Sequence, residues 1–315
     1  MAEKSNATSK WNATDLPALT GRTAVVTGAN SGLGLRTADA LARAGAHVVF
    51  AVRDVERGRA AAATVNGSTE VRRLDLADLS SVREFADAWE GPLSLLINNA
   101  GVMMIPQRRT RDGFEMQFGT NHLGHFALTN LLLPYVTDRV VTVASAAHRW
   151  GGGATIDFAD LNLDADYTPR GAYARSKLAN LLFTLELQRR LTESGSPVRA
   201  LAAHPGYAAT NLQSHSGNPA VRAFMQVGNR LFAQDDRAGA LPTLYAATQD
   251  LPGASYVGPD GTGEMRGAPT LVGRTAAASD TAVARRLWTV SEELTGAVFP
   301  SAAVESAAGE SAGRG

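Results

Sequence analysis

From residue 23 to residue 294, short runs of β-branched and other apolar residues alternate with longer stretches of helical periodicity. This alternation constrains the fold more than any other feature, because strands that alternate with helices form βαβ units around a parallel sheet. Each run is short and apolar throughout, which is typical of strands covered by helices on both faces. The predicted strands are residues 23–27, 47–51, 70–74, 94–98, 140–144, 198–203 and, as a seventh, 255–257. The predicted helices are residues 33–44, 55–65, 80–89, 112–135, 172–192 and 281–294.

The predicted fold class is therefore α/β, with one doubly wound parallel sheet of about seven strands and a ligand crevice beyond the carboxyl ends of those strands. The 315 residues fit a single domain of this kind over residues 19–298. A polar tail is expected at residues 1–18. A disordered tail rich in Ala, Gly, Ser and Glu is expected at residues 299–315, because such a segment buries too little apolar surface to offset the entropy of ordering.

Composition narrows the classes of partner. Lys plus Arg and Asp plus Glu both number 30, so the net charge offers no general attraction to nucleic acid or to an anionic membrane. The chain has no Cys, which excludes disulfides and thiol catalysis. No signal-peptide core and no apolar run of membrane-spanning length is present, so a cytoplasmic protein with small-molecule partners and no transmembrane segment is expected.

A glycine-rich turn follows the first predicted strand directly. It reads Thr27-Gly-Ala-Asn-Ser-Gly-Leu-Gly34 and leads into the first predicted helix. Glycines allow the backbone to approach a pyrophosphate closely, and the start of a helix supplies free N–H groups and partial positive charge. The spacing Gly-x-x-x-Gly-x-Gly differs from the Gly-x-Gly-x-x-Gly of long-chain dinucleotide enzymes. The turn is predicted to bind the phosphates of a nucleotide cofactor.

Tyr173 and Lys177 lie four residues apart in a predicted helix, so both side chains project from the same face. A cation beside a phenol favours the phenolate and would make Tyr173 a better proton-transfer group near neutral pH. The scarcity of Lys supports a functional role for this pair. Apart from Lys4 and Lys10 near the N-terminus, Lys177 is the only Lys in the chain. Elsewhere the chain uses Arg as its cation. A Lys at this position suggests a need for a compact ammonium that can contact both a ribose and a phenol.

The glycine turn, the Asn98-Asn-Ala-Gly101 segment after the fourth strand and the Tyr-x-x-x-Lys pair together resemble the short-chain dehydrogenase/reductase family. The resemblance covers roughly residues 19–295 and implies a Rossmann-type fold and hydride transfer between a nicotinamide cofactor and a carbonyl or alcohol. It places the family's four catalytic side chains on Asn121, Ser145, Tyr173 and Lys177. In the family, the Asn holds a water that joins the Lys to bulk solvent, and this role is implied for Asn121. It places the cofactor contacts on Gly28, Asn30, Ser31, Gly32, Leu33, Gly34, Asp75, Leu76, Asn99, Ala100, Gly101, Tyr173, Lys177, Pro205, Gly206 and Thr210.

The end of the second strand predicts which nicotinamide cofactor is used. NAD-preferring relatives carry an acidic residue where this chain has Val52, and Arg53 follows, whose planar guanidinium suits a 2′-phosphate. Asp54 comes next, in a position to cap the following helix. We therefore expect NADP(H), with Arg53 as a further cofactor contact.

The substrate is indicated only by class. Residues 148–170, which lengthen the distance between Ser145 and Tyr173, are expected to form a loop over the site. Residues 207–237 contain apolar side chains at partly helical spacing and are expected to form a lid. A helix packed on the core is the alternative for this apolar stretch. Independently of it, residues 148–170 and the segments Asn121-His-Leu-Gly-His-Phe126, Ser176-Lys-Leu-Ala-Asn180 and Arg285-Arg-Leu-Trp288 resemble the retinol dehydrogenase and WW-domain oxidoreductase branch, which implies a lipophilic aldehyde, ketone or alcohol as substrate.

Other interpretations remain open from the sequence alone. An epimerase or dehydratase with bound NAD would also need the Tyr-x-x-x-Lys pair, and a non-catalytic dinucleotide-binding regulator would need the glycine turn. His122 and His125 are spaced like a metal pair but lack nearby acidic ligands, so packed or solvent-facing roles and no metal site are expected. The resemblance also suggests a homo-dimer or tetramer.

Overall fold

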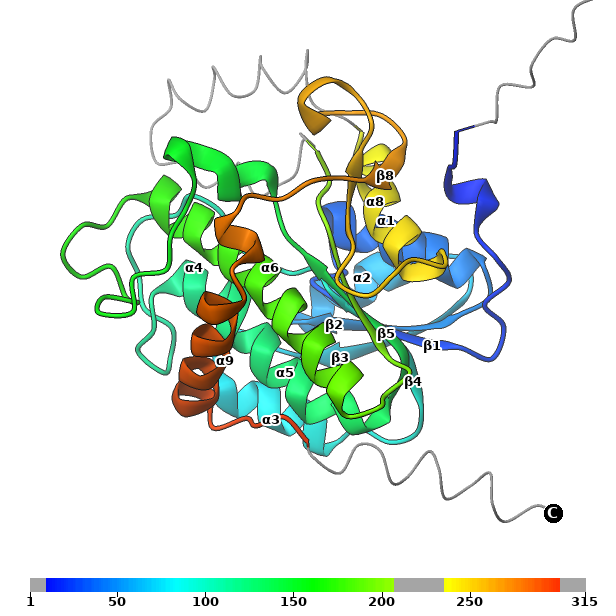
Figure 1. Cartoon of the computed structure of the whole chain (residues 1–315). Helices are drawn as coiled ribbons and strands as arrows, with labels where there is room; N and C mark the ends of the chain where they lie inside the picture. Colours follow the sequence, from blue (N-terminus) through cyan, green and yellow to red (C-terminus); the bar gives the residue numbers. More distant parts are fainter. Residues whose placement is uncertain (1–9, 207–234, 301–315) are drawn as a thin grey trace, which may run out of the picture.

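The computed structural model describes residues 10–206 and 235–300, which form one sheet between two layers of helices (Figure 1). Most of the expected lid at residues 207–237 lies outside the described residues. In spatial order, the eight strands of the sheet are β3 (Ser68–Arg73), β2 (His47–Val52), β1 (Thr23–Thr27), β4 (Leu93–Asn98), β5 (Val136–Val143), β6 (Arg199–Ala203), β7 (Tyr256–Pro259) and β8 (Pro269–Leu271). Neighbouring strands from β3 to β7 pair in parallel, and β8 pairs antiparallel with β7.

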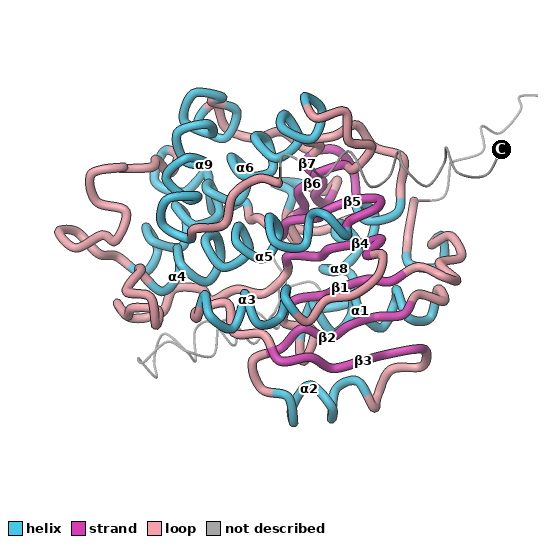
Figure 2. Tube along the Cα trace, turned by 90° about the horizontal axis from the view of Figure 1, so that it is seen from below, coloured by secondary structure: helices cyan, strands magenta, loops and turns pink. Residues whose placement is uncertain are grey.

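Helices cover both faces of the sheet, as the apolar strands predict. Over the described residues, the α-helices are α1 (Gly32–Arg43), α2 (Val55–Ala62), α3 (Leu79–Asp87), α4 (Met116–Phe118), α5 (Gly124–Leu132), α6 (Pro169–Glu193), α8 (Asp236–Thr248) and α9 (Thr281–Thr295). Helices α1, α2 and α8 lie on one face of the sheet, and α3, α5 and α6 lie on the other (Figure 2). Their apolar side chains form two separate clusters with the strands. The doubly wound α/β fold is thus confirmed, with one antiparallel strand added at an edge.

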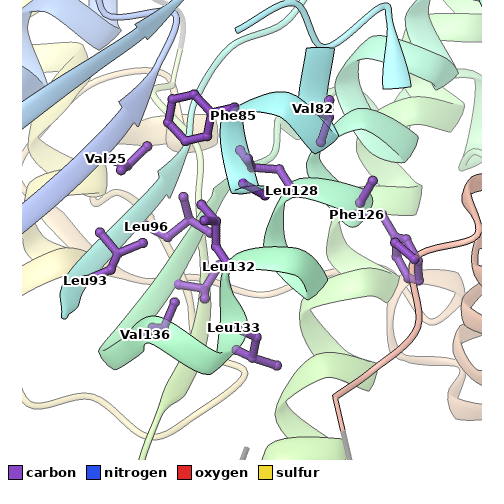
Figure 3. Close-up of a cluster of buried hydrophobic side chains, with 14 of the residues drawn as sticks. Val25, Val82, Phe85, Leu93, Leu96, Phe126, Leu128, Leu132, Leu133 and Val136 are labelled. Carbon is purple, nitrogen blue, oxygen red and sulfur yellow. The ribbon is translucent and has the colours of Figure 1, made fainter. Parts of the chain in front are cut away.

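Strand β1 shows why the sheet is buried on both sides. Its successive side chains point to opposite faces. Val25 belongs to the apolar cluster formed with α3, α5 and α6, whereas Ala24 and Val26 belong to the cluster formed with α1, α2 and α8. Figure 3 shows the first cluster, in which Val25 and Leu96 face side chains of α3 and α5. Because both faces are apolar, the polar ligand site is confined to the ends of the strands.

The expected helix at residues 112–135 is broken into several pieces. Arg109 forms an isolated bridge with Glu115, and the Glu115 carboxylate accepts the N–H groups of Gln117 and Phe118, so the helical segment begins only at α4. A π-helical turn, Gly119–Leu123, then joins α4 to α5, and a 3₁₀ turn, Leu133–Tyr135, follows α5. The π-helical turn carries Asn121 and is the kind of irregularity often found at functional sites.

Residues 10–18, expected as part of a polar tail, pack against the domain. Trp11 contacts the Tyr245 ring of α8 edge to face, with the ring centroids 5.1 Å apart. The Lys10 ammonium lies 2.7 Å from the Asp260 carboxylate. A short 3₁₀ helix, Ala13–Asp15, is capped by the Asn12 side chain. The ordered unit therefore begins before residue 19. The segment is polar on average, but the single Trp11 side chain provides a large apolar surface that packs on the domain.

Candidate active site

A cavity of about 630 Å³ lies at the carboxyl ends of the parallel strands, where the fold predicts the ligand crevice. Most of the residues expected at the site line this cavity: Gly28, Asn30, Ser31, Gly32, Leu33, Gly34, Arg53, Asp75, Leu76, Asn99, Ala100, Gly101, Ser145, Tyr173, Lys177, Pro205 and Gly206. Asn121 lies behind the wall of the cavity, fully buried. Thr210 falls outside the described residues. The residues expected from separate strand ends are thus brought together around one space.

The glycine turn fits closely between α1 and the β4 end. Gly28 has a φ of +66°, which a residue with a Cβ atom rarely adopts. A Cβ atom at Gly34 would lie 2.5 Å from the Gly28 carbonyl oxygen and 2.5 Å from Asn99 Nδ2. Helix α1 begins at Gly32, so the unpaired N–H groups of its first turn lie beside the cavity. This arrangement is suited to an anionic pyrophosphate.

Thr27, at the end of β1, holds this end of the cavity together. Its hydroxyl oxygen accepts the N–H groups of Asn99 and Ala100, both at 2.9 Å, and lies 2.9 Å from His125 Nε2. Asn99 Nδ2 donates to the Thr27 carbonyl oxygen at 2.8 Å. Burial lowers the pKa of His125 to about 4, so the ring is neutral at pH 7. Its Nε2 can therefore accept a hydrogen bond from the Thr27 hydroxyl. The family segment after β4 is therefore locked to the strand that precedes the glycine turn.

At the far end of the nucleotide region, two arginines flank the start of α2. Arg53 and Arg57 are exposed and line the cavity, whereas Val52 is buried beneath them. The Asp54 carboxylate caps α2 by accepting the Arg57 N–H at 3.0 Å, which is the capping role expected for it. Sequence reasoning missed Arg57. The sequence feature that could have identified Arg57 is its place in the first turn of a helix, four residues after Arg53.

The expected proton-transfer pair lies on α6, and Ser145 lies two residues after the end of β5, at the start of a 3₁₀ segment. The Ser145 side chain lies close enough to Tyr173 to affect the pKa of its phenol, and Ser145 Oγ accepts the Ala147 N–H at 3.1 Å. Lys177 Nζ donates to the Val143 carbonyl oxygen at 2.9 Å and lies 5.7 Å from the centroid of the Tyr173 ring. Tyr173, Ser145 and Lys177 therefore form one compact group on the cavity wall.

The pKa values within this group correct one expectation. Burial raises the pKa of Tyr173 to about 12, and the nearby Ser145 side chain opposes that rise. Burial also lowers the pKa of Lys177 to about 8. The expected lowering of the Tyr173 pKa by Lys177 is wrong for this structure, because removing the phenol from water outweighs any other influence on it. The Tyr173 hydroxyl thus keeps its proton at neutral pH.

Asn121 supports the cavity wall from behind. Its Oδ1 accepts the Val102 N–H at 2.8 Å, and its Nδ2 donates to the Val102 carbonyl oxygen and to Ser176 Oγ, both at 2.9 Å. A Cβ atom at Gly101 would lie 3.0 Å from Asn121 Oδ1, so the chain passes Asn121 closely at this glycine. The described contacts make Asn121 a positioning residue. Its expected part in a water link to Lys177 stays a prediction.

The histidines of the same helical region are packed inside the protein. His122 and His125 are both fully buried, and His122 Nε2 lies 2.9 Å from Ser291 Oγ. Within the described residues, no cluster of three or more potential metal ligands occurs.

The opposite end of the cavity is formed by residues that the sequence did not single out. Met103, Met104, Trp150 and Met265 contribute apolar surface there. Trp150 belongs to the expected loop at residues 148–170 and lies 5.9 Å from the Tyr173 ring, centroid to centroid. Glu264 also lines this end.

Comparison with known proteins identifies the family. A family model described as short chain dehydrogenase matches residues 22–220. The chain belongs to the short-chain dehydrogenase/reductase family. It is 44% identical to human retinol dehydrogenase 13 over 89% of this chain and 86% of that protein. It is 41% identical to mouse polyprenol dehydrogenase over 90% of this chain and 86% of that protein.

A solved structure is also similar. An uncharacterised protein from Mycobacterium paratuberculosis is 56% identical, with a TM-score of 0.80 over 92% of this chain and 99% of that chain. As a short-chain dehydrogenase/reductase of the retinol dehydrogenase-like group, the protein is an oxidoreductase that interconverts alcohols and carbonyls with a nicotinamide dinucleotide cofactor. Among the residues that the structure describes, none of the helices combines the length and apolar character needed to cross a membrane.

Proposed function

We propose that this short-chain dehydrogenase/reductase is an NADP(H)-dependent enzyme that reduces a lipophilic aldehyde or ketone, or oxidises the corresponding alcohol. The observation that carries the proposal is the group formed by Tyr173, Ser145 and Lys177 at the junction of two unlike ends of one cavity. One end is lined by a glycine turn and arginines, and the other by apolar side chains.

The residues present fit a dinucleotide. Gly34 leaves no room for a Cβ atom beside Asn99, so the turn closes tightly and its backbone N–H groups border the cavity. When bound, NADPH would supply a hydride to the carbonyl carbon. The glycine turn would hold the pyrophosphate, and Asp75 with Leu76 would lie beside the adenine.

The catalytic group would handle the proton. In reduction, Ser145 Oγ donates a hydrogen bond to the carbonyl oxygen and so favours the negative charge that develops there. Tyr173 then passes its proton to that oxygen as general acid. Even with its pKa raised to about 12, the phenol is a stronger acid than the alcohol that forms, so the proton transfer is favourable. Lys177 would hold the nicotinamide ribose and compensate the charge left on Tyr173.

The preference for NADP(H) rests on Arg53 and Arg57. Both residues line the cavity at the end of β2, where the strand ends in apolar Val52. The nearby Asp54 carboxylate, which also lines the cavity, is engaged in capping α2 through the Arg57 N–H. Each guanidinium can donate two hydrogen bonds to a phosphate. The start of α2 adds partial positive charge at the same place.

The lipophilic substrate rests on the other end of the cavity. Met103, Met104 and Met265 are flexible apolar side chains that adapt to irregular ligands, and Trp150 adds a broad apolar surface. The two named relatives fit this assignment, because retinol and polyprenols are both lipophilic alcohols.

The proposal is tested by following NADPH oxidation with a panel of aldehydes and ketones that ranges from propanal to decanal and all-trans-retinal. We expect sustained turnover that favours the longer substrates. Substituting Tyr173 with Phe should lower kcat about 10²- to 10⁴-fold, because the general acid is lost while the ring is kept. Turnover that survives the Phe substitution would refute the mechanism. Dinucleotide binding without any turnover would favour a regulator, and redox-neutral conversion with bound NAD would favour an epimerase or dehydratase.

A further inference from the structure

Three charged or titratable side chains from three separate segments meet at the substrate end of the cavity. Arg149 lies four residues after Ser145, in the 3₁₀ segment Ala146–Gly152. His204 follows β6 directly and precedes the Pro205-Gly206 turn. Glu264 lies in the short 3₁₀ segment Thr262–Glu264, between β7 and β8. Ser145, four residues before Arg149, and the Pro205-Gly206 turn, directly after His204, both border the same cavity.

Glu264 joins the other two residues. Its carboxylate accepts two hydrogen bonds from the Arg149 guanidinium, with Nη1 to Oε2 at 2.8 Å and Nη2 to Oε1 at 3.1 Å. His204 Nε2 lies 3.0 Å from Glu264 Oε2. Arg149 also donates to the Gly273 carbonyl oxygen, after β8. A single carboxylate therefore ties the loop after β5 to the turn after β6.

His204 has a defined tautomer in this cluster. Its Nδ1 accepts the Gly206 N–H at 3.2 Å, so Nε2 carries the proton and donates it to Glu264. Burial lowers the pKa of His204 to about 4, which keeps the ring neutral at pH 7. The imidazole is fully buried and lies against Gly258, where a Cβ atom would come within 2.0 Å of Nε2. The Gly206 end of the turn is thus hydrogen-bonded through His204 to Glu264.

The backbone at Glu264 is strained. Its φ is +56°, a left-handed conformation that residues with a side chain rarely adopt. Gly263 before it has a similar φ of +64°, which glycine adopts readily. Strain of this kind persists where the surroundings hold a residue in place, and here the carboxylate is held by Arg149 and His204. The conformation brings Glu264 to the cavity wall beside Met265.

We propose that Glu264 is a positioning residue that, through Arg149 and His204, fixes the loop after Ser145 and the Pro205-Gly206 turn relative to each other. This inference rests on the proposed function, in which Ser145 contacts the substrate oxygen and the turn borders the nicotinamide. Glu264 thereby sets how the carbonyl meets Ser145 and Tyr173. It leaves the adenosine end, formed by Arg53, Asp75 and the glycine turn, untouched.

The test compares Glu264→Ala and Glu264→Gln with the wild type, using NADPH and decanal. The matched control is Glu70→Ala, which breaks an ion pair with Arg72 (2.7 Å) on β3, away from the cavity. NADPH titration gives the dissociation constant and the number of binding-competent sites, and kcat is then expressed per site. We expect Glu264→Ala to lower kcat per site about ten- to hundredfold, since a displacement of about 1 Å can cost that much. Glu264→Gln, which keeps the shape and one acceptor oxygen, should lose less.

The outcomes separate positioning from mere stability. The NADPH dissociation constant of Glu264→Ala should stay within about threefold of the wild type, as should kcat per site in Glu70→Ala. If Glu264→Ala only reduced the number of binding-competent sites, with kcat per site unchanged, the residue would serve stability alone and the inference would be overturned. If the wild type itself showed no NADPH-dependent turnover with any carbonyl, the proposed function would fail first, and this inference with it.

Discussion

The two ends of the cavity are built in different ways. At the nucleotide end the lining comes from short continuous segments at strand ends: the glycine turn, the segment after β4 and the first turns of α1 and α2. At the substrate end it comes from loops far apart in the chain, including Trp150, Glu264 and the adjacent Met265. A site built on continuous segments at strand ends suits a cofactor that does not vary. A site built on separate loops can change its specificity without disturbing the fold.

The largest expected effect lies where the two ends meet. Substituting Lys177 with Met should lower kcat/KM about 10²- to 10⁴-fold, because the ammonium next to the proton donor is lost. Burial lowers the pKa of Lys177 to about 8, so this side chain is charged below that pH and neutral above it. We therefore expect kcat/KM of the wild type to fall as the pH rises through about 8. A pH profile with NADPH and decanal measures this.

A Lys177→Arg variant is the control for the pH profile. Its guanidinium keeps its proton throughout the accessible range, so the decline near pH 8 should disappear even though kcat/KM itself is reduced. A decline that persisted near pH 8 in this variant would belong to another group.

The next largest effect tests the nucleotide end of the cavity alone, through the choice between NADPH and NADH. Replacing both Arg53 and Arg57 with Ala should reduce the preference for NADPH over NADH, expressed as a ratio of kcat/KM values, about ten- to hundredfold. The 2′-phosphate is the only difference between the cofactors. A ten- to hundredfold change corresponds to about 1.4–2.8 kcal/mol for the pair, and it is no larger because solvent weakens the hydrogen bonds of two exposed arginines to a charged group. Arg59→Ala is the matched control, since Arg59 lies on the same helix but pairs with Glu56 (2.6 Å) away from the cavity. An unchanged preference in the double variant would contradict the cofactor assignment.

The smallest effect concerns the substrate end. Trp150→Ala should raise the KM for decanal about three- to tenfold, because part of the apolar contact with a long chain is lost. The KM for propanal should barely change, and the NADPH dissociation constant should stay as in the wild type. Steady-state kinetics with both aldehydes measure the difference. An equal rise in the KM values for decanal and propanal would mean that Trp150 acts through the neighbouring Tyr173 ring. The two ends of the cavity would then be less independent than the structure indicates.

Much of the fold was predictable because its strands are short, apolar and separated by periodic segments. Strand β1 was predicted with its observed bounds, and the other parallel strands differ by a few residues at their ends. Helix α8 was not predicted, because Gly239 and Pro242 interrupt its pattern, although tertiary packing on α1 supports it. The break before α4 depends on the Glu115 side chain, which competes for the N–H groups that a continuous helix would use.

The two ends of the site also differ in how far they can be predicted from the sequence. The residues of the nucleotide end occur in local motifs, such as residues 27–34 and 98–101, whose spacing can be read directly. Arg149, His204 and Glu264 are brought together only by the fold, across separations of 115 and 60 residues. No local pattern marks such a cluster. The positive φ of Glu264, which helps to expose its role, is likewise invisible before the structure is known.

The eighth strand has a consequence for assembly. An unpaired edge strand offers N–H and C=O groups on which a second chain can add, and proteins limit this with short strands, proline or charge. Strand β8 has three residues and begins with Pro269. The opposite edge, β3, carries Glu70, Arg72 and Arg73. Both edges therefore resist growth of the sheet, so an association between copies of this protein would use its helical faces.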